Sequence, residues 1–272
     1  MIAIVDISGG LGNQLFQCSF ALYLKDLGVK VYFFDSENKL FINERFLGIK
    51  KLNFISSRFL EILKKFKLFA KFYKVVTSNE VQSNDESIIN YYEKLKIISF
   101  NGYFQNYEYA NKYKDEIKRS LLETFKEYGN KNPNTKSNTL IHVRRSDYLD
   151  TNEQLEISYY SKAMEHCNEK IKDFSYDIFT DDYEWVISQP IFNKANYVEK
   201  STNIVKRHKK DVLSTFCNML DYENYIIANS TFSWWAAILS YDSNTIVSQP
   251  KPFFNWDVIH NLSVSEWKDF PR

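Results

Sequence analysis

The amino-acid sequence predicts an α/β protein with two halves, each built around a mainly parallel sheet. Short runs of β-branched and aromatic residues alternate with stretches of helical period along most of the 272 residues. The alternation stops in a polar stretch at residues 127–138 and then starts again, which indicates a second unit. With 22 Phe, 19 Tyr and 5 Trp against only 7 Gly and 5 Pro, the chain can bury a large core and is not of a collagen-like or disordered class.

The first half opens with a β-loop-α-β unit. Residues 2–6 form a short apolar run that ends at Asp6, as expected of a buried first strand. Apolar side chains then recur at helical spacing through residues 15–23, and residues 29–34 form a second run of β-branched and aromatic residues. The remaining elements that we expect in this half are a basic helical stretch at residues 41–74, a strand near residues 97–100 and a helix at about residues 107–126.

Residues 127–138 are the expected linker, because they lack apolar periodicity and are rich in Asn, Lys, Ser and Thr. We therefore expect an N-terminal half at residues 1–130, a second half at residues 139–255, and a C-terminal segment at residues 256–272 that could return to the first half. The strands expected in the second half lie at residues 139–143, 176–179, near 197, 225–228 and 245–247, and the helices at residues 159–171, 183–188, 211–220 and 231–241.

Charge and cysteine content exclude several classes of function. The 35 Lys and Arg residues are balanced by 34 Asp and Glu residues, so no global positive field attracts nucleic acid, and no nucleic-acid partner is expected. Cys18, Cys167 and Cys217 are far apart and form no Cys-x-x-Cys pair. This spacing argues against a disulfide framework and against a thiolate zinc site, and it fits a reducing compartment.

Secretion and membrane insertion are not expected either. The first apolar run has no basic segment before it and reaches Asp6 too soon for a secretory signal. The uncharged stretches at residues 7–24 and 224–241 are each 18 residues long, but both contain many polar side chains. A cytoplasmic protein is therefore expected. The basic, aromatic-rich stretch at residues 58–74 could contact an anionic membrane surface, although a solvated helix with its aromatic face on the core is the more common arrangement.

A glycine-rich turn at residues 9–14, Gly-Gly-Leu-Gly-Asn-Gln, joins the first strand to the first helix. It is not a dinucleotide fingerprint, whose third Gly is replaced by Leu15, and no Gly-Lys-Ser/Thr follows to make a P-loop. Two interpretations stay open: a tight turn that needs glycine, or a loop whose backbone N–H groups meet a ligand at a helix N-terminus. The carboxamides of Asn13 and Gln14 favour the second, since they can hydrogen-bond a sugar or a phosphate.

The segment at residues 142–148, His-Val-Arg-Arg-Ser-Asp-Tyr, follows the first strand of the second half. Ligands of open α/β sheets gather beyond the carboxyl ends of the strands, so Arg144 can offer its guanidinium fork to phosphate oxygens. A surface ion-pair cluster with Asp147 is the alternative. His142 alternates with apolar neighbours and is expected on the opposite face of the sheet, where a hydrogen-bonded core histidine is the ordinary explanation.

Two adjacent carboxylates, Asp181 and Asp182, follow the next predicted strand. Three roles stay open for them. One of them could be the N-cap of the helix that begins near Tyr183, or they could bind a divalent metal, although no Asp-x-Asp or His-x-His pair exists to complete such a site. The third role is to accept two N–H bonds from a guanine edge.

The segment at residues 229–237, Asn-Ser-Thr-Phe-Ser-Trp-Trp-Ala-Ala, follows an apolar strand and begins a helix. Ser230 or Thr231 is a natural N-cap, so hydroxyl and backbone N–H groups converge at a helix N-terminus and form an uncharged phosphate cradle. Trp234 and Trp235 are expected to pack in the core against the sheet. Together with Arg144, this cradle indicates a nucleotide diphosphate that binds in a cleft between two Rossmann-like halves.

Taken in order, the four motifs closely resemble those of the α-1,2-fucosyltransferases of glycosyltransferase family 11, from residue 4 to about residue 250. The resemblance implies a GT-B-type fold, in which two Rossmann-like halves with mainly parallel sheets face each other across a cleft. It also implies GDP-β-L-fucose as the donor substrate, inversion to an α-fucoside, and no metal ion or other cofactor. Residues 139–255 would then bind GDP-fucose, and residues 1–130 would form the acceptor side.

The same resemblance assigns roles in the reaction. Arg144 would hold the β-phosphate, and Asn13 would face the fucose and the leaving group. Apart from the resemblance, a general base is optional when the leaving group is this well stabilised, and the acidic candidates for one are Asp147 first and Glu153 second. Arg145 would order the motif through Asp147. His142 and Asp182 would contact guanosine, and Ser230 to Ser233 would take the phosphates. The donor-binding residues expected in this way are Gly10, Gly12, Asn13, His142, Arg144, Asp181, Asp182, Ser230, Thr231, Phe232 and Ser233.

The acceptor is not given by the sequence. A terminal galactose in an oligosaccharide or glycolipid precursor is the family default, and a bacterial cytoplasmic enzyme acting on such a precursor fits the composition. A fucosyltransferase of another linkage, such as α-1,6 or α-1,3, and a non-catalytic glycan-binding protein that uses its many aromatic residues are the alternatives.

Overall fold

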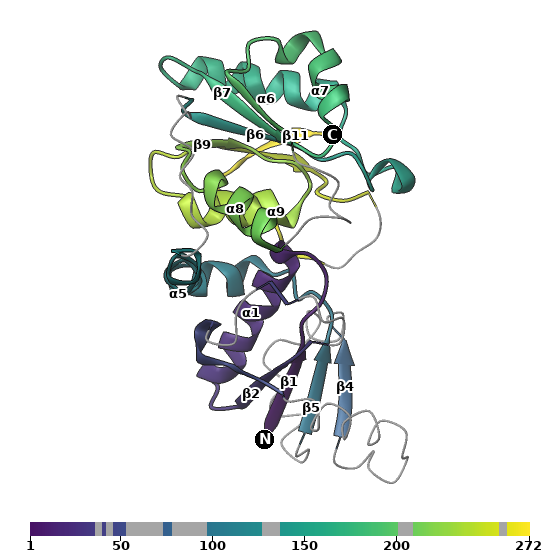
Figure 1. Ribbon diagram of the computed structural model, residues 1–272, viewed down its shortest axis with the longest axis vertical. Coiled ribbons are helices and arrows are strands. Elements are labelled where there is room, and N and C mark those ends of the chain that lie inside the picture. The colour runs from purple at the N-terminus through teal and green to yellow at the C-terminus, as the bar shows by residue number, and fades with distance from the viewer. Residues whose placement is uncertain are drawn as a thin grey trace. The chain divides into compact units, whose positions relative to one another are not determined.

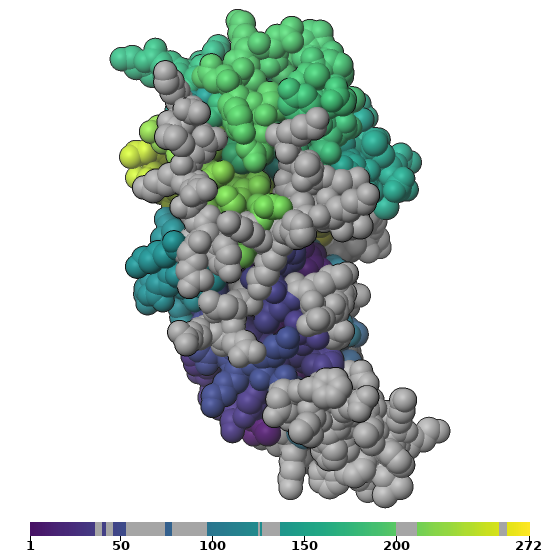
Figure 2. Space-filling view, in the orientation of Figure 1, coloured from purple at the N-terminus to yellow at the C-terminus, as the bar shows by residue number. Residues whose placement is uncertain are grey.

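The computed structural model describes residues 1–35, 40–41, 46–52, 73–77, 97–126, 137–200, 209–255 and 260–272. The chain divides into two compact units (Figure 1). Unit 1 contains Met1–Thr124 and Ile259–Leu262, and unit 2 contains Phe125–Val258 and Ser263–Arg272. In Figure 2 the purple and blue surfaces belong to unit 1 and the green surfaces to unit 2.

The sheet of unit 1 has the strand order β3-β2-β1-β5-β4, and its strand pairs are all parallel. The first strand lies in the middle. The chain winds outward from β1 through β2 to β3, and the next strands are β4 at the opposite edge and then β5, which lies between β4 and β1. The switch in direction falls between β1 and β5. The elements of unit 1 are β1 (Ile2–Asp6), α1 (Leu11–Asp26), β2 (Lys30–Phe34), a 3-10 turn (Phe46–Gly48), β3 (Lys50–Lys51), β4 (Tyr73–Thr77), β5 (Ile97–Asn101) and α5 (Tyr107–Phe125).

Aromatic packing holds α1 against the end of β5 and against α5. The ring of Phe20 stacks on Phe104 with centroids 4.1 Å apart, and it meets Phe100 edge-on at 5.1 Å. Tyr109 of α5 lies 5.7 Å from the same ring. Offset-stacked and edge-on pairs of this kind add to the free energy of area burial. The loop that follows β5 is therefore anchored beside the middle of α1.

The basic helical stretch expected at residues 41–74 is partly wrong. Its described parts hold a 3-10 turn, the short strand β3 and the start of β4 rather than a helix. Lys50 pairs with Tyr32 at the edge of the sheet, and exposed edge strands often carry lysine, which discourages pairing with another chain. A basic stretch is therefore compatible with an edge strand. Residues 53–72, and with them most of the membrane-contact stretch, lie outside the described residues, as do residues 127–136 of the expected linker.

The sheet of unit 2 has the order β11-β10-β9-β6-β7-β8, and it is also parallel throughout its described pairs. Three strands lie on each side of the switch between β6 and β9, which is the order of dinucleotide-binding doubly wound folds. The elements are β6 (Thr139–Val143), a 3-10 turn (Leu149–Thr151), α6 (Ile157–Lys170), β7 (Tyr176–Thr180), α7 (Tyr183–Ser188), a 3-10 turn (Pro190–Phe192), β8 (Tyr197–Lys200), α8 (Lys209–Met219), β9 (Asn224–Ile226), α9 (Thr231–Ser240), β10 (Val247–Lys251) and β11 (Lys268–Pro271). The predicted α/β class with mainly parallel sheets is confirmed.

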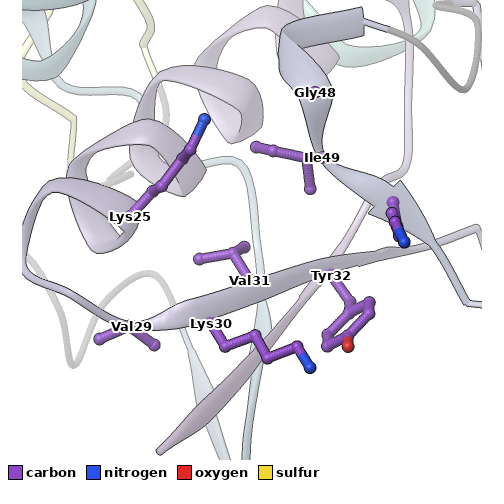
Figure 3. Close-up of a pocket in the computed structure, with 8 residues that line it drawn as sticks. Lys25, Val29, Lys30, Val31, Tyr32, Gly48 and Ile49 are labelled. Atoms are coloured by element: carbon purple, nitrogen blue, oxygen red, sulfur yellow. The ribbon is translucent and has the colours of Figure 1, made fainter.

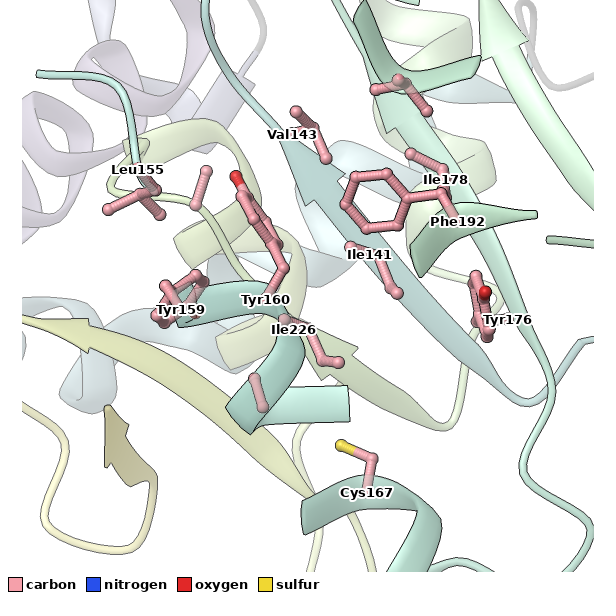
Figure 4. Packing of buried hydrophobic residues seen from close by; sticks show 13 residues of the cluster. Ile141, Val143, Leu155, Tyr159, Tyr160, Cys167, Tyr176, Ile178, Phe192 and Ile226 are labelled. Carbon is pink, nitrogen blue, oxygen red and sulfur yellow. The ribbon is translucent and has the colours of Figure 1, made fainter. Parts of the chain in front are cut away.

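Helices cover both faces of this sheet, with α6 and α7 on one face and α8 and α9 on the other (Figure 1). On the α6 face, Ile141, Val143 and Ile178 pack against Tyr159 and Tyr160 in one buried cluster (Figure 4). Side chains alternate between the faces of a strand, so the residue between Ile141 and Val143 points to the α9 face. None of the helices in the described ranges combines the length and the apolar character that a membrane span requires.

Candidate active site

The three polar segments predicted in the second half of the sequence meet at the carboxyl edge of the unit 2 sheet. The loops after β6, β7 and β9 all begin there because the strands are parallel. His142 at the end of β6 shares a 2.9 Å hydrogen bond between its Nδ1 and Ser233 Oγ in the first turn of α9. The predicted orientation of His142 is thus confirmed. The contact spans the switch between β6 and β9, where ligands of this fold class bind.

Arg144 is held between two carboxylates. Its Nη2 lies 2.6 Å from Asp147 Oδ1 and its Nη1 lies 2.9 Å from Asp181 Oδ2. The Asp147 side chain is 60% exposed, whereas Asp181 is only 2% exposed and Arg144 12%. The guanidinium also lies 5.4 Å from the ring centroid of Tyr148. The contacts with the buried Asp181 and with Tyr148 fix the direction of the Arg144 guanidinium, whereas the exposed side chain of Asp147 can move away from it.

Asp181 anchors the loop that carries Arg144. Its Oδ1 accepts hydrogen bonds from the backbone N–H groups of Arg145 at 2.8 Å and Ser146 at 3.4 Å. Ser146 Oγ donates to the backbone carbonyl of Asp181 at 3.0 Å. The N-cap role belongs to Asp182 rather than to Asp181, whose buried contacts shape the loop that carries Arg144, and a contact with a guanine edge stays a prediction. In the described part of the chain, no three His, Cys, Asp or Glu side chains gather as a metal site.

Asp182 is the N-cap of α7, as one interpretation of the sequence predicted. Its Oδ1 accepts the backbone N–H of Trp185 at 3.3 Å, and its Oδ2 lies 3.1 Å from Arg145 Nε. The Arg145 guanidinium carbon lies 3.8 Å from the Trp185 ring centroid. The expectation that Arg145 acts through Asp147 is therefore wrong. The side chains of the two consecutive arginines diverge, so that Arg145 reaches α7 and Arg144 takes Asp147.

The N-terminus of α9 lies where the sequence placed it. Ser230 occupies the N-cap position, although its hydroxyl makes no capping bond. The first helical hydrogen bond runs from Trp234 N to Ser230 O at 3.0 Å, so the backbone N–H groups of Phe232 and Ser233 lie in the first turn, before the helical hydrogen-bond ladder begins. Ser233 Oγ donates to Ser230 O at 3.2 Å. Trp234 and Trp235 are fully buried, which confirms their predicted place in the core.

Tyr148 connects Arg144 to this helix N-terminus, a link that the sequence did not reveal. Its hydroxyl donates to the backbone carbonyl of Asn229 at 2.9 Å, while its ring lies beside Arg144. Burial raises the pKa of Tyr148 well above its ordinary value, so the hydroxyl remains a donor at neutral pH. The residue lay within a quoted motif, but its partner is 81 positions away in the chain.

Glu153 is not available as the general base that the sequence offered as a second candidate. The side chain is only 1% exposed. Its carboxylate accepts hydrogen bonds from Arg272, Asn229 and the backbone of Asn255. A group that binds a substrate proton must reach the substrate, and these contacts use both of its oxygens within the protein.

The glycine turn lies at the carboxyl edge of the unit 1 sheet, again beside the switch. Gly9 has a φ of +73°, and a Cβ atom there would lie 3.0 Å from a ring carbon of Tyr103. Gly10 is exposed at the N-cap of α1, and a Cβ atom there would meet nothing within 4 Å. Gly12 is buried in the first turn of the helix. Gly9 is thus required by the turn, whereas Gly10 leaves open space in front of a helix N-terminus.

The two carboxamides of the turn differ in their surroundings. Gln14 is fully buried, where its Nε2 donates to Gly9 O at 3.0 Å and its Oε1 accepts from Phe41 N at 2.9 Å. Gln14 therefore has a structural role. Asn13 is half-buried, and its Oδ1 accepts from Gln105 Nε2 at 3.1 Å. Ligands of open α/β sheets bind beyond the carboxyl ends of the strands, and Gln105 follows β5. The same argument, applied to the predicted strand at residues 97–100, would have drawn attention to Gln105.

A separate cavity of about 290 Å³ in unit 1 contains none of the predicted site residues (Figure 3). Lys25, Lys30 and Lys50 lie around it, and Val31 and Ile49 form apolar walls. It lies at the β2–β3 edge of the sheet. Lys50 lies on the edge strand β3, where lysine has the structural explanation given above, and Lys25 lies in the last turn of α1, where a basic side chain suits the helix dipole, so we assign no ligand to this cavity.

Sequence comparison identifies relatives over almost the full chain. The model of Glycosyl transferase family 11 matches residues 2–257. An α-1,2-colitosyltransferase of Escherichia coli is 26% identical over an alignment 292 residues long, which covers 96% of this chain and 95% of that protein. The E. coli O-antigen biosynthesis glycosyltransferase WbnK is 25% identical over an alignment 311 residues long, which covers 96% of this chain and 98% of that protein.

Solved structures share the fold at low identity. A mutant of Arabidopsis thaliana FUT1 in complex with GDP has a TM-score of 0.53 at 11% identity, covering 94% of this chain and 72% of that chain. The α-1,6-fucosyltransferase NodZ soaked with GDP-fucose also has a TM-score of 0.53 at 11% identity, covering 88% of this chain and 92% of that one. The expected GT-B-type fold is confirmed. Since the family model also matches nearly the whole sequence, this protein belongs to glycosyl transferase family 11.

Proposed function

We propose that this glycosyltransferase transfers L-fucose from GDP-β-L-fucose to the 2-hydroxyl of a terminal galactose, with inversion and without a metal ion. The observation that carries the proposal is the connection of Arg144 to the N-terminus of α9 through Tyr148, which contacts Arg144 with its ring and Asn229 O with its hydroxyl at the switch point of unit 2. A guanidinium fork and a helix N-terminus are both suited to phosphate oxygens. The four ordered sequence motifs and the family membership support a GDP-sugar donor.

The diphosphate would bind to Arg144 and to the first turn of α9. The backbone N–H groups of Phe232 and Ser233 lie in the first turn of α9, before the helical hydrogen-bond ladder begins, and the helix dipole adds positive potential at this end. Arg144 keeps N–H donors beyond the two that face Asp147 and Asp181. Negative charge that develops on the leaving diphosphate would be stabilised by these groups.

His142 and Asp182 are the proposed guanosine contacts. The hydrogen bond between His142 Nδ1 and Ser233 Oγ ties the imidazole ring to the first turn of α9. The proposed contact of this ring with the nucleoside would therefore be made in a fixed direction. Asp182 is 27% exposed, and each of its oxygens can accept a second hydrogen bond beyond Trp185 N and Arg145 Nε.

The proposed reaction is a single displacement at the anomeric carbon. The 2-hydroxyl oxygen of the acceptor forms the new bond to C1 of fucose while the bond between C1 and the β-phosphate oxygen breaks, and its electron pair leaves with GDP. The hydroxyl proton passes to a base or to water. Asp147 is the candidate base, since its side chain is 60% exposed and departs from Arg144 most easily. Asn13, with Gly10 at the exposed start of α1, is proposed to contact the fucose, whereas Gly12 is buried in the first turn of that helix.

Transfer of colitose is a second candidate, because a relative that aligns with 96% of this chain is named an α-1,2-colitosyltransferase. Colitose is L-fucose without its 3-hydroxyl group. A site that hydrogen-bonds a hydroxyl strongly rejects the analogue that lacks it, whereas a site that ignores the hydroxyl accepts both. Side-by-side assays with the fucosyl and colitosyl donors therefore separate the two candidates.

Calorimetric titration with GDP tests the donor site. The wild-type protein should bind GDP, and Arg144→Ala should weaken binding by about a hundredfold or more, because a charge-assisted contact to phosphate is lost. Arg119→Ala, which removes an exposed guanidinium from α5 of unit 1, is the matched control and should leave binding unchanged.

Two outcomes would count against the proposal. A protein that binds glycans but not GDP would be a glycan-binding module, and unchanged GDP affinity in Arg144→Ala would remove Arg144 from the phosphate site. Transfer should also persist in a chelator, since the proposed charge stabilisation comes from Arg144 and backbone N–H groups.

A further inference from the structure

We propose that Glu153 and Arg272 are positioning residues, which hold the turn between β9 and α9 so that the N–H groups of the helix N-terminus point at the donor phosphates. This inference rests on the proposed function. It assigns a role to a buried ion pair that the reaction itself does not use.

The carboxylate of Glu153 is the centre of a buried polar cluster. Arg272 Nη1 donates to its Oε2 at 2.7 Å, and Arg272 Nη2 donates to the backbone carbonyl of Glu153 at 2.6 Å. The backbone N–H of Asn255 donates to Oε1 at 2.8 Å. The side chains of Glu153 and Arg272 are 1% and 9% exposed. The pair is therefore shielded from water, where a charge–charge contact is strongest.

Asn229 connects this cluster to the helix. Its Nδ2 donates to the Glu153 carbonyl at 2.8 Å and to Glu153 Oε2 at 3.1 Å. Asn229 is fully buried and directly precedes Ser230, the N-cap of α9. Its backbone carbonyl accepts the Tyr148 hydroxyl on the other side. The residue before the helix is thus held through both its side chain and its backbone, and both holds come from the loop after β6.

The topology explains why these distant residues meet. Arg272 follows β11, Asn255 lies after β10, Asn229 lies between β9 and α9, and Glu153 lies in the connection after β6. All of these strands are parallel, so all four loops begin at the carboxyl edge of the sheet. The Glu153–Arg272 ion pair therefore connects the end of β11 to the loop after β6, and the hydrogen bonds of Asn229 connect that loop to the one after β9. The loops after β6 and β9 flank the switch point.

Removing the Arg272 guanidinium would leave the Glu153 carboxylate buried without its cation. A buried carboxylate in that situation takes up a proton or turns toward water. Either change alters the acceptor that Asn229 Nδ2 uses, so the β9–α9 turn loses a fixed partner. Phosphate binding at a helix N-terminus depends on the direction of a few N–H groups, and small changes in that direction weaken it.

If Arg272 had a purely structural role, its replacement would lower stability in the same way but would have no specific effect on the binding of the donor. Asp177 provides the comparison within the same unit. It is fully buried in β7, where its oxygens accept hydrogen bonds from Tyr222 at 2.7 Å and from Ser137 at 2.6 Å. It is the second residue of its strand and so lies near the amino edge of the sheet, away from the switch point. Tyr222→Phe therefore also takes a donor from a buried carboxylate, at the opposite edge.

The experiment compares Arg272→Met with Tyr222→Phe by thermal unfolding and by calorimetric titration with GDP. Both variants should unfold at lower temperature than the wild type. Arg272→Met should weaken GDP binding by about tenfold, whereas Tyr222→Phe should leave the Kd within about twofold of the wild type. Arg272→Lys, which keeps the charge but can make only one of the two contacts, should restore part of the affinity.

If Arg272→Met does not fold, Asn229→Ala is the second variant for the same test. It removes the tether to the turn but leaves the Glu153–Arg272 pair in place, and it should weaken GDP binding by a similar factor. Equal GDP affinity in wild type, Arg272→Met and Asn229→Ala would overturn the positioning role. That result would leave the proposed function standing as long as the wild type binds GDP and Arg144→Ala does not, whereas a wild type that fails to bind GDP would overturn the proposed function itself.

Discussion

Arg144 is shared by two carboxylates whose surroundings differ sharply. Asp181 is 2% exposed and also accepts backbone N–H groups of the Arg144 loop, so it belongs to the folded framework. Asp147 is 60% exposed and contacts only one end of the guanidinium. An incoming phosphate would bring a third negative charge to the same guanidinium, and the exposed Asp147 would be displaced at a lower free-energy cost than the buried Asp181.

Replacement of Asp147 by Asn should leave GDP affinity unchanged or raise it by about two- to fivefold, because a competing exposed charge is removed. If Asp147 also takes the acceptor proton, kcat should fall while the Kd for GDP does not rise. Steady-state kinetics and GDP titration of the same preparation check both points. A large loss of GDP affinity in this variant would show that Asp147 supports Arg144 rather than competing for it.

Replacement of Asp181 by Asn should have the opposite sign. The buried guanidinium would lose the partner that fixes its direction, so GDP affinity should fall by about tenfold or more and the melting temperature should drop as well. Circular dichroism melting curves, together with the same GDP titration, measure the two effects. Similar GDP affinities in the Asn variants of Asp147 and Asp181 would contradict the distinction drawn here.

Sequence reasoning identified the side chains of the site better than their partners. Arg144 could be predicted because it follows a strand, and the N-cap position of Ser230 because the pattern of a helix start is local. The pairing of Arg145 with Asp182 and Trp185 depends on where the next βα loop lies in space. Contacts such as the one between Glu153 and Arg272, 119 positions apart, have no signal in a single sequence.

The glycine turn of unit 1 shows how one element combines a backbone requirement with an open edge. Gly9 has the left-handed φ of +73° and a crowded Cβ position, while its neighbour Gly10 has a φ of −74° and free space around it. Only the first of these positions requires glycine for steric reasons. The exposed helix start at Gly10 is therefore open for a ligand without cost to the turn.

Two alanine substitutions separate these roles. Gly9→Ala should lower the free energy of unfolding by about 1–2 kcal/mol, because an L-residue is forced into the left-handed region against Tyr103. Gly10→Ala should change it by less than about 0.5 kcal/mol. Denaturant titration of both variants measures the difference. Equal stabilities of the two variants would mean that the turn relaxes to accept a side chain at Gly9.

Two strands were predicted poorly, β10 and β11, because neither has the regular alternation of apolar and polar residues that identifies a strand in a sequence. β10 was expected to end at residue 247, yet it continues to Lys251 through Pro250. Its pairing with β9 covers only Val247 and Ser248, so proline lies where one side of the strand has no such partner. β11, with the sequence Lys-Asp-Phe-Pro, is too short and polar to show strand alternation, and only its pairing with β10 reveals it.

At the scale of the whole molecule, the two units repeat one design. Each has a parallel sheet whose first strand is central, and each carries its singled-out polar segments at the carboxyl edge beside the switch in winding. This much follows from the βα rhythm of the sequence and from the general behaviour of open α/β sheets. The strand order itself could not be predicted, because it depends on long-range pairing.

The stability of the fold should depend on pH through His260, a half-buried residue of unit 1. Burial lowers the pKa of His260 below the ordinary value of about 6.5. Below that pH the unfolded chain takes up a proton more readily than the folded one, so this part of the stability is present at neutral pH and is lost as the pH falls. His260→Gln removes the titrating group.

Melting temperatures at about pH 7.5 and about pH 5.5 check this expectation. The wild type should lose more stability on acidification than His260→Gln does. Equal losses in the two proteins would show that His260 titrates alike in the folded and unfolded states.

The reaction itself is tested most directly by incubating the protein with GDP-fucose and a panel of galactosides in the presence of a chelator, followed by determination of the linkage in the product. We expect an α-1,2-linked fucosyl galactoside to form with the wild type, and turnover to fall by several orders of magnitude with Arg144→Ala. A product with another linkage would reassign the acceptor site. Transfer that stops in the chelator, or continues undiminished without the Arg144 guanidinium, would contradict a diphosphate held by Arg144 and the start of α9.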